Sequence, residues 1–186
     1  ISENQEALAK GEELVSNLNI SEIAKAIKQN PVIHVFYEWE TLPTATDIES
    51  KFTESGVANV VLHEKKNFSH GRYTALYNQN FAAVINLNRY KIAIPLDGSG
   101  NINKYYKDEY DESLATFLNK RCEEKLAHYI EIGTGAMMPA QWNVEAMTIL
   151  PYLITAIGEE LGTDISKPLK PFPEEASQLY DYKGRF

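Results

Sequence analysis

The segment from Lys65 to Tyr73, KKNFSHGRY, contains the residue types with the clearest capacity for chemistry. His70 stands between a serine and a glycine, and Arg72 follows two positions later. An imidazole changes its charge near neutral pH, so it can give or take a proton, and a guanidinium can hold a phosphate. The alternatives are a polar turn residue for His70 and a surface ion pair with a carboxylate for Arg72. The elements around this segment determine which interpretation applies.

In the first third of the chain, hydrophobic patterns predict two helices, a strand and a third helix. Residues 3–18 are expected to form the first helix, and Ser21 can cap the second. The run Val32 to Trp39, VIHVFYEW, has the β-branched and aromatic composition of a buried strand. Thr46 and Glu49 have the spacing of a capping box and predict the start of the third helix.

In the rest of the chain, further strands alternate with two longer helices. These strands are expected at Val57–His63, Phe81–Leu87, Lys91–Leu96 and His128–Gly133. The run from Lys91 could equally be part of a hairpin. The helices are expected at Asp111–Lys125 and Asn143–Leu161, where Pro151 implies a kink and Gly162 a stop.

This alternation of strands and helices predicts an α/β fold. We expect a three-layer α/β/α sandwich whose mainly parallel sheet has about five strands. The 186 residues are interpreted as one domain, with leading helices, a core and an extended tail at residues 1–30, 31–166 and 167–186. Ligands of such folds lie at the carboxyl ends of the strands. The loops expected there are residues 40–46, 64–73 and 134–142, and the second contains His70.

Net charge and cysteine usage exclude several functions. The formal net charge of −8 argues against nucleic acid and against an anionic membrane surface as partners. No apolar run approaches the roughly 20 residues of a membrane-spanning helix. The single cysteine, Cys122, excludes an internal disulfide and favours a reducing, cytoplasmic location.

Two further sets of residues have both a chemical and a structural interpretation. Thr44 and Thr46 lie at an expected helix start, where hydroxyl groups can hold a phosphate, but capping explains Thr46 as well. His34, His63 and His128 lie in expected strands, where packing explains them. No histidine–carboxylate spacing indicates a metal site, and no motif indicates a cofactor.

Two motifs stand out in the middle and near the end of the chain. Glu54 precedes the strand VANVVLH and the loop NFSHG, and it stands sixteen residues before His70. The closing segment, Leu150 to Pro168, reads LPYLITAIGEELGTDISKP. Together these motifs resemble the SIS (sugar isomerase) domain family. In that family a helix ending in glutamate is followed, at the same spacing, by a strand and a loop of the type ELKHGP, and the closing motif is similar. The pattern looks like the second SIS unit of the isomerase half of the glucosamine-fructose-6-phosphate aminotransferases.

The resemblance implies a flavodoxin-like fold, a homodimer and a sugar-phosphate substrate. It implies aldose–ketose isomerisation without a cofactor, with Glu54 as the base that moves a proton between C1 and C2. His70 would open the sugar ring from the neighbouring subunit. Arg72, Thr44 and Thr46 are then candidates for binding the substrate. The structural alternative for Glu54 is a solvated carboxylate at a helix end.

The chain also departs from the family pattern. Where the aminotransferases carry a Schiff-base lysine, this chain has Pro173, and Lys170 is out of register. Asn67 replaces the glutamate of the ELKHG motif. The Ser/Thr-rich loop that grips the phosphate belongs to the first SIS unit, so the chain is expected to be the second half of a double-SIS protein. Two alternatives remain, a phosphosugar-binding or regulatory module without catalysis and a deglycase that cleaves a sugar-phosphate–amine conjugate.

Overall fold

The computed structural model describes residues 2–89, 91–92, 105–106, 109–134, 136 and 138–165. The strands of its main sheet are β1 (Val32–Tyr37), β2 (Asn59–Glu64), β3 (Ala83–Asn88) and β6 (His128–Gly133). The long helices are α1 (Ser2–Asn17), α2 (Ile20–Gln29), α3 (Leu42–Glu54), α6 (Glu109–Lys125) and α7 (Pro139–Leu161). The short elements are η1 (Trp39–Thr41), α4 (Lys65–Asn67), η2 (Phe68–Arg72), α5 (Thr74–Asn78), β4 (Lys91–Ile92) and β5 (Tyr105–Tyr106).

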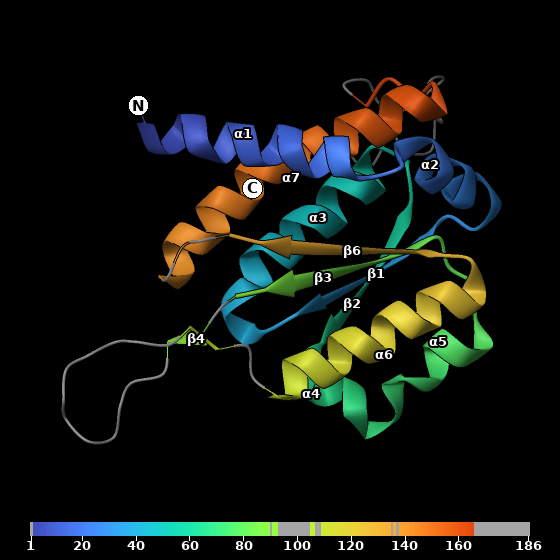
Figure 1. Cartoon of the computed structure of the whole chain (residues 1–186). Coiled ribbons are helices and arrows are strands. Elements are labelled where there is room, and N and C mark those ends of the chain that lie inside the picture. The colour runs from blue at the N-terminus through green and yellow to red at the C-terminus, as the bar shows by residue number, and fades with distance from the viewer. Residues whose placement is uncertain are drawn as a thin grey trace, which may run out of the picture.

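The main sheet is parallel throughout, with the strand order β2-β1-β3-β6 (Figure 1). Val35 in β1 is in register with Leu62 in β2 and Ile85 in β3. The chain leaves β1 toward β2 on one side and later returns to β3 on the other side. The carboxyl ends of β1 and β3 therefore flank a topological switch point, where open α/β sheets bind their ligands.

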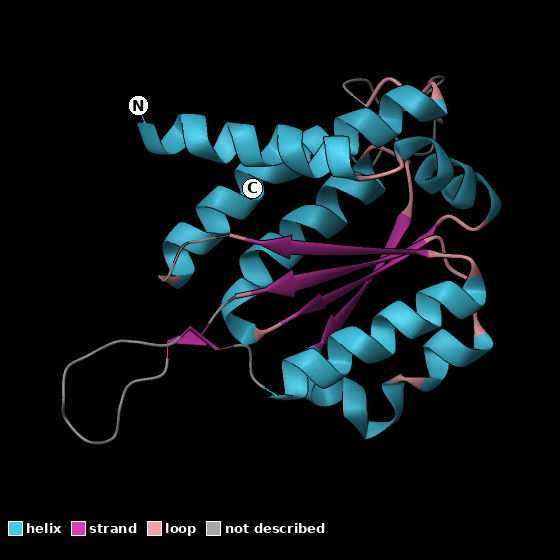
Figure 2. Cartoon of the chain, viewed as in Figure 1, coloured by secondary structure: helices cyan, strands magenta, loops and turns pink. Residues whose placement is uncertain are grey.

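Helices cover both faces of this sheet and make two separate hydrophobic cores (Figure 2). On one face, Ile48 and Phe52 of α3 and Leu150 of α7 pack against the sheet. On the other face, Phe68 of η2 and Leu118 of α6 pack against it. The expected three-layer α/β/α sandwich is confirmed, although the parallel sheet of the described residues has four strands rather than about five.

Helix starts are where the sequence-based expectations were wrong. Helix α3 begins at Leu42, four residues before Thr46, because Thr41 is the cap and Pro43 fits the first turn. The hydroxyl of Thr46 instead donates to the carbonyl of Leu42 at 3.0 Å. Likewise Asn19, and not Ser21, caps α2, since its side chain accepts from the backbone N–H of Glu22.

The last expectations concern the hairpin, the final helix and the tail. β4 and β5 pair antiparallel, which confirms the hairpin alternative for the described part of the run from Lys91. Helix α7 begins at Pro139 and continues through Pro151, and Gly162 ends it with a φ of 71°, as expected. Residues 93–96 and the tail from Lys167 lie outside the described residues. No helix in the described part is long and apolar enough to cross a membrane.

Candidate functional site

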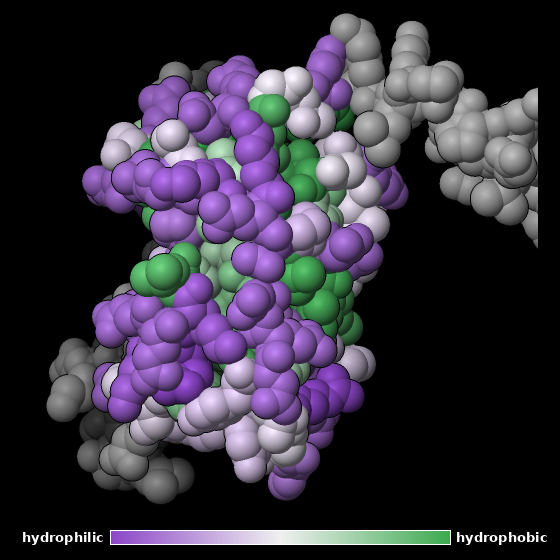
Figure 3. Space-filling model, turned by 90° about the vertical axis from the view of Figure 1, so that its right-hand side faces the viewer, coloured by the Kyte–Doolittle hydropathy of each residue, from purple (hydrophilic) through white to green (hydrophobic). Residues whose placement is uncertain are grey.

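Glu54 is the last residue of α3, at the amino ends of the strands. Its side chain is exposed, and the carboxylate accepts a hydrogen bond from the hydroxyl of Ser50 at 2.9 Å. Figure 3 shows the face of the molecule at this end of the sheet, where hydrophilic residues surround smaller hydrophobic areas. The carboxylate of Glu54 is therefore open to a molecule that approaches this face.

His70 lies in a turn that its two neighbours hold in place. The backbone leaves helical geometry at His70, and Gly71 has a φ of 106°. The hydroxyl of Thr74 donates to the carbonyl of Gly71 at 2.9 Å, and that of Ser69 donates to Lys66 at 3.1 Å. The side chain of His70 is exposed and makes no hydrogen bond within the described residues. The sequence around His70 thus builds a turn that presents a free imidazole.

One chain does not bring Glu54 and His70 together. Helix α3 covers one face of the sheet, whereas η2, which carries His70, covers the other. In Figure 1 the two elements lie on opposite sides of β2. β2 is an edge strand of the sheet, so both residues are close to an edge that a second copy of the chain can approach. A site with both groups requires two chains.

Arg72 faces a shallow pocket of about 280 Å³ beside the edge strand. The pocket is lined by His63, Arg72, Thr74, Ala75, Asn78 and Gln79. Arg72 is exposed and forms no ion pair with a carboxylate in the described part of the chain. The pKa of His63 is lowered to about 4, mainly by burial. The charge of His34 and then the charge of Arg72 make smaller contributions in the same direction. Within the described residues, Arg72 therefore has no partner of the kind that the surface-pair alternative requires.

Thr44 and Thr46 lie in the first two turns of α3, whereas Glu54 is the last residue of this helix. Thr44 is fully buried, and its hydroxyl donates to Oδ1 of Asn143 at 2.6 Å. The amide of Asn143 donates in turn to the carbonyls of Glu40 and Pro139 at 2.8 and 2.7 Å. Thr44 thereby fixes the start of α3 to α7, and its hydroxyl does not face solvent.

A larger pocket, with a volume of about 530 Å³, lies at the carboxyl ends of β1 and β2. We call it the carboxyl-edge pocket, and its lining residues are Glu38, Trp39, Glu40, Glu64, Lys65, Lys66, Ser69, Tyr110 and Asp111. Two of the three loops expected at this edge, residues 40–46 and 64–73, contribute to it. None of the described residues in the range 134–142 lines it.

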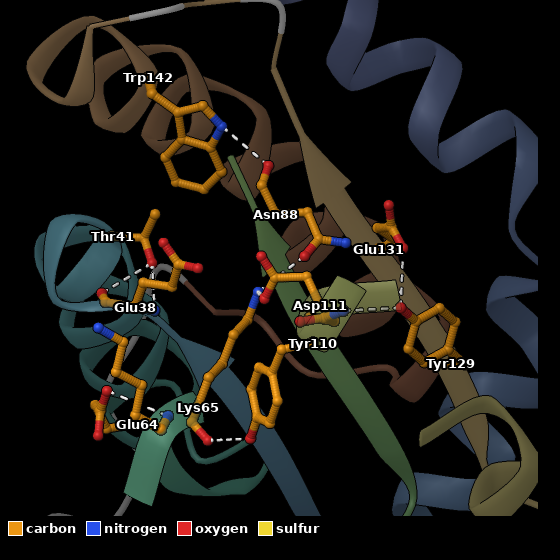
Figure 4. Close-up of polar contacts among 12 residues, drawn as sticks. Glu38, Thr41, Glu64, Lys65, Asn88, Tyr110, Asp111, Tyr129, Glu131 and Trp142 are labelled. Atoms are coloured by element: carbon orange, nitrogen blue, oxygen red, sulfur yellow. Dashed lines mark hydrogen bonds and ion pairs between the residues drawn. The ribbon is translucent and has the colours of Figure 1, made fainter. Parts of the chain in front are cut away.

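Lys65 forms a buried wall of the carboxyl-edge pocket, with 1% of its surface exposed. Its ammonium group donates to Oδ1 of Asn88 at 2.8 Å and approaches Oδ1 of Asp111 at 3.4 Å. The hydroxyl of Tyr110 donates to the backbone carbonyl of Lys65 at 2.6 Å (Figure 4). Burial raises the pKa of Tyr110. The switch point therefore carries an enclosed charged pair.

Sequence reasoning did not identify Lys65, because it stands in a run of charged and polar residues that is typical of a surface loop. Its partners Asn88 and Asp111 lie 23 and 46 positions away. Only the parallel register brings the ends of β2 and β3 and the start of α6 to one place. The position of Lys65, two residues after the expected strand Val57–His63, was the one available signal.

Comparison with known proteins identifies the fold. No family model and no curated protein matches the sequence. Among solved structures, the chain is similar to one from Listeria monocytogenes described as "a putative sugar-phosphate isomerase". The TM-score is 0.53 at 11% sequence identity, and the match covers 87% of this chain and 80% of the other. The chain thus has the fold of that protein over most of its length.

Proposed function

We propose that this chain is an SIS domain of the phosphosugar isomerase type, which interconverts an aldose phosphate and a ketose phosphate. Glu54 takes the proton from one of the carbons C1 and C2 and returns it to the other. His70 of a second copy protonates the ring oxygen and opens the sugar. Both are general acid–base steps that need a group free to approach the substrate.

The observation that carries this proposal is the exposure of two residues with the SIS spacing on opposite sides of an edge strand. Glu54 and His70 are both exposed, and neither is tied to a carboxylate or a cation in the described part. A second copy that contributes its His70 would complete the site of Glu54, and in a two-fold symmetric dimer the reverse contact would form a second, identical site. The fold shared with the Listeria protein supports the same class of reaction.

The substrate's phosphate is proposed to bind Arg72, two residues after His70. A guanidinium is a strong partner for phosphate, and Arg72 has no carboxylate partner in the described part. The buried bond of Thr44 to Asn143 gives Thr44 a role in the fold instead. The Ser/Thr-rich phosphate loop is proposed to come from another SIS unit, with which this unit forms a double-SIS homodimer.

A complementation experiment on the full-length protein tests the shared site. Glu54→Gln and His70→Ala should each abolish isomerisation of fructose 6-phosphate and glucose 6-phosphate. After the two variants are mixed and allowed to exchange subunits, half of the dimers carry one intact site. Activity should then return to about a quarter of the wild-type value.

The same experiment separates the alternatives. Each variant mixed with itself is the control and should stay inactive. Failure to recover activity in verified mixed dimers would overturn the shared site. A wild-type protein that binds these sugar phosphates without converting them would indicate the binding module. Release of an amine from a sugar-phosphate conjugate would indicate the deglycase.

A further inference from the structure

The pocket that Arg72 faces, which we call the edge-strand pocket, has no acidic side chain among the described residues that line it. Its polar lining consists of Arg72, His63 and three uncharged side chains, those of Thr74, Asn78 and Gln79. The protein as a whole has a formal net charge of −8. The edge-strand pocket is therefore a local exception, with an electrostatic character that differs from that of the rest of the chain.

His63 is the buried member of this lining, with 4% of its surface exposed. Burial lowers its pKa to about 4, and the charges of His34 and Arg72 lower it further in the same direction. The imidazole is therefore uncharged at neutral pH. The guanidinium of Arg72 then provides the charge of the described lining, and this charge is positive.

Three side chains of the lining offer N–H donors. A guanidinium has five N–H groups, and each side-chain amide has two. Asn78 is the last residue of α5, and Gln79 follows it; both are exposed, and their amides make no hydrogen bond within the described residues. The hydroxyl of Thr74 already donates to the carbonyl of Gly71. Arg72, Asn78 and Gln79 are therefore the groups that can donate to a ligand.

These donors and the positive charge select a ligand group that carries negative charge and several acceptor oxygens. A phosphate monoester has both, and a guanidinium can bind two of its oxygens at once. The volume of about 280 Å³ lies just below the range of roughly 300–1,000 Å³ that is usual for small-molecule sites. The pocket therefore suits the charged end of a ligand, while the rest of the ligand lies outside it.

We infer that the edge-strand pocket is the phosphate subsite of the sugar-phosphate site, in which Asn78 and Gln79 bind the phosphate together with Arg72. The identity of the substrate in this inference rests on the proposed function. Arg72 and His70 belong to the same element, η2, whereas Glu54 ends a helix on the other face of the sheet. The copy of the chain that opens the sugar ring therefore also holds the phosphate, and the other copy supplies the base.

Calorimetry on the full-length protein tests the class of ligand. The Glu54→Gln variant is used so that the substrate is not converted, and glucose 6-phosphate, fructose 6-phosphate, the two unphosphorylated sugars and inorganic phosphate are titrated separately. At least one ester should bind at least about tenfold more tightly than its sugar, because only the ester offers a charged acceptor to Arg72. Inorganic phosphate should bind more weakly than that ester.

Two results of these titrations would contradict the inference. Equal binding of both esters and their parent sugars would show that no phosphate subsite exists. Binding of inorganic phosphate as tight as that of the esters would show a site for free phosphate, and it would reject the assignment to the substrate.

Variants assign the binding to this pocket. Asn78→Asp keeps the size of the side chain but places a carboxylate in the lining, and it should weaken binding of the ester at least about tenfold. Asn80→Asp is the matched control, because Asn80 is exposed and does not line the pocket. It should bind the ester within about threefold of wild type. Arg72→Gln should weaken binding more than Arg72→Lys, which keeps the charge but loses the planar fork. Unchanged binding in Asn78→Asp and Arg72→Gln would place the phosphate elsewhere and reject the inference.

Subunit complementation tests which copy holds the phosphate. At low substrate concentration, Glu54→Gln mixed with Arg72→Gln should reach about a quarter of the wild-type rate, because each mixed dimer has one site with an intact Glu54 and an intact η2. His70→Ala mixed with Arg72→Gln should stay below the rate of Arg72→Gln alone, since neither copy has an intact η2. The reverse pattern would overturn the inference and leave the shared site of Glu54 and His70 in place.

The same set of mixtures separates this inference from the proposed function. If Glu54→Gln and His70→Ala complement each other but Glu54→Gln and Arg72→Gln do not, the phosphate subsite is rejected and the isomerase site is retained. If Glu54→Gln and His70→Ala do not complement each other, the proposed shared site is rejected, and the titrations of Asn78→Asp and Asn80→Asp decide separately whether the pocket binds a phosphate group.

Discussion

Two buried histidines from adjacent strands contact each other directly, with Nδ1 of His34 2.8 Å from Nε2 of His63. Their rings are stacked, and Phe36, Phe68 and Phe81 surround them. Their other ring nitrogens have no hydrogen-bond partner within the described residues. Since one nitrogen must donate and the other accept, the pair is held together when both rings are neutral.

This pair predicts a loss of stability in mild acid. Burial lowers the pKa of both histidines to about 4, and for His63 the charges of His34 and Arg72 contribute further. The unfolded chain therefore binds protons below about pH 6.5 that the folded chain rejects until about pH 4. The contribution of the two neutral histidines to the free energy of unfolding is therefore complete above about pH 6.5 and declines as the pH falls. Each histidine contributes a slope of up to about 1.4 kcal/mol per pH unit.

Urea unfolding between pH 7 and pH 4.5 measures this slope. The double variant His34→Phe/His63→Phe removes both titrating groups and leaves neither nitrogen unpaired. Its stability should depend less on pH, while acid titration of the carboxylates remains in both proteins. The same pH dependence in the double variant and in wild type would show that the pair does not couple to folding.

A second prediction concerns the charged pair in the wall of the carboxyl-edge pocket. Asp111→Leu leaves the ammonium of Lys65 buried beside Asn88, and Lys65→Met leaves the carboxylate of Asp111 buried. Each single change should destabilise the fold by roughly 3 kcal/mol, because it removes one partner of a buried ion pair. The double variant should be more stable than the sum of the two changes predicts. A double-mutant cycle in urea measures this coupling, and additive effects would show that the two charges do not interact.

The sequence predicted the strands well because buried strands need β-branched and aromatic residues wherever they lie. His34 and His63 were expected in strands, with packing as their role, and both lie buried in β1 and β2. The start of α3 was missed by four residues, since hydrophobic periodicity does not show which residue before Pro43 caps the helix. Lys65 was missed because its burial depends on contacts between distant segments.

The local sequence pattern could not predict how Glu54 and His70 are placed relative to each other. Their spacing of sixteen residues suggested a common site, yet the sheet separates the elements that carry them. The chain passes through β2 between them and reverses to the other face, so residues near in sequence end on opposite sides. Only a second copy could unite them, and the sequence of one chain does not specify its orientation.

The turn at His70 gives a third prediction. Gly71 has a φ of 106°, which side chains other than glycine rarely adopt, although no atom lies within 4 Å of an added Cβ. Gly71→Ala should therefore cost about 1–2 kcal/mol through backbone strain alone and displace His70. Gly133→Ala is the matched control, because its Cβ would meet only the carbonyl of Asn88 at 3.6 Å. Denaturant unfolding and isomerase assays compare the stability and the activity of the two variants. Equal losses in both variants would show that the turn at Gly71 has no special role.

The final prediction concerns the proposed base. Glu54→Gln keeps the size of the side chain and an oxygen that can accept from Ser50, but it removes the carboxylate. Because the residue is exposed at a helix end, stability should stay near that of wild type. Turnover in the full-length protein should fall at least about a hundredfold, and uptake of solvent deuterium at C2 should fall in parallel. Glu49→Gln on the same helix is the control and should keep wild-type turnover. If Glu54→Gln isomerises within a few-fold of wild type, the carboxylate at the end of α3 is only a solvated group, because a base that carries the proton cannot be replaced by an amide.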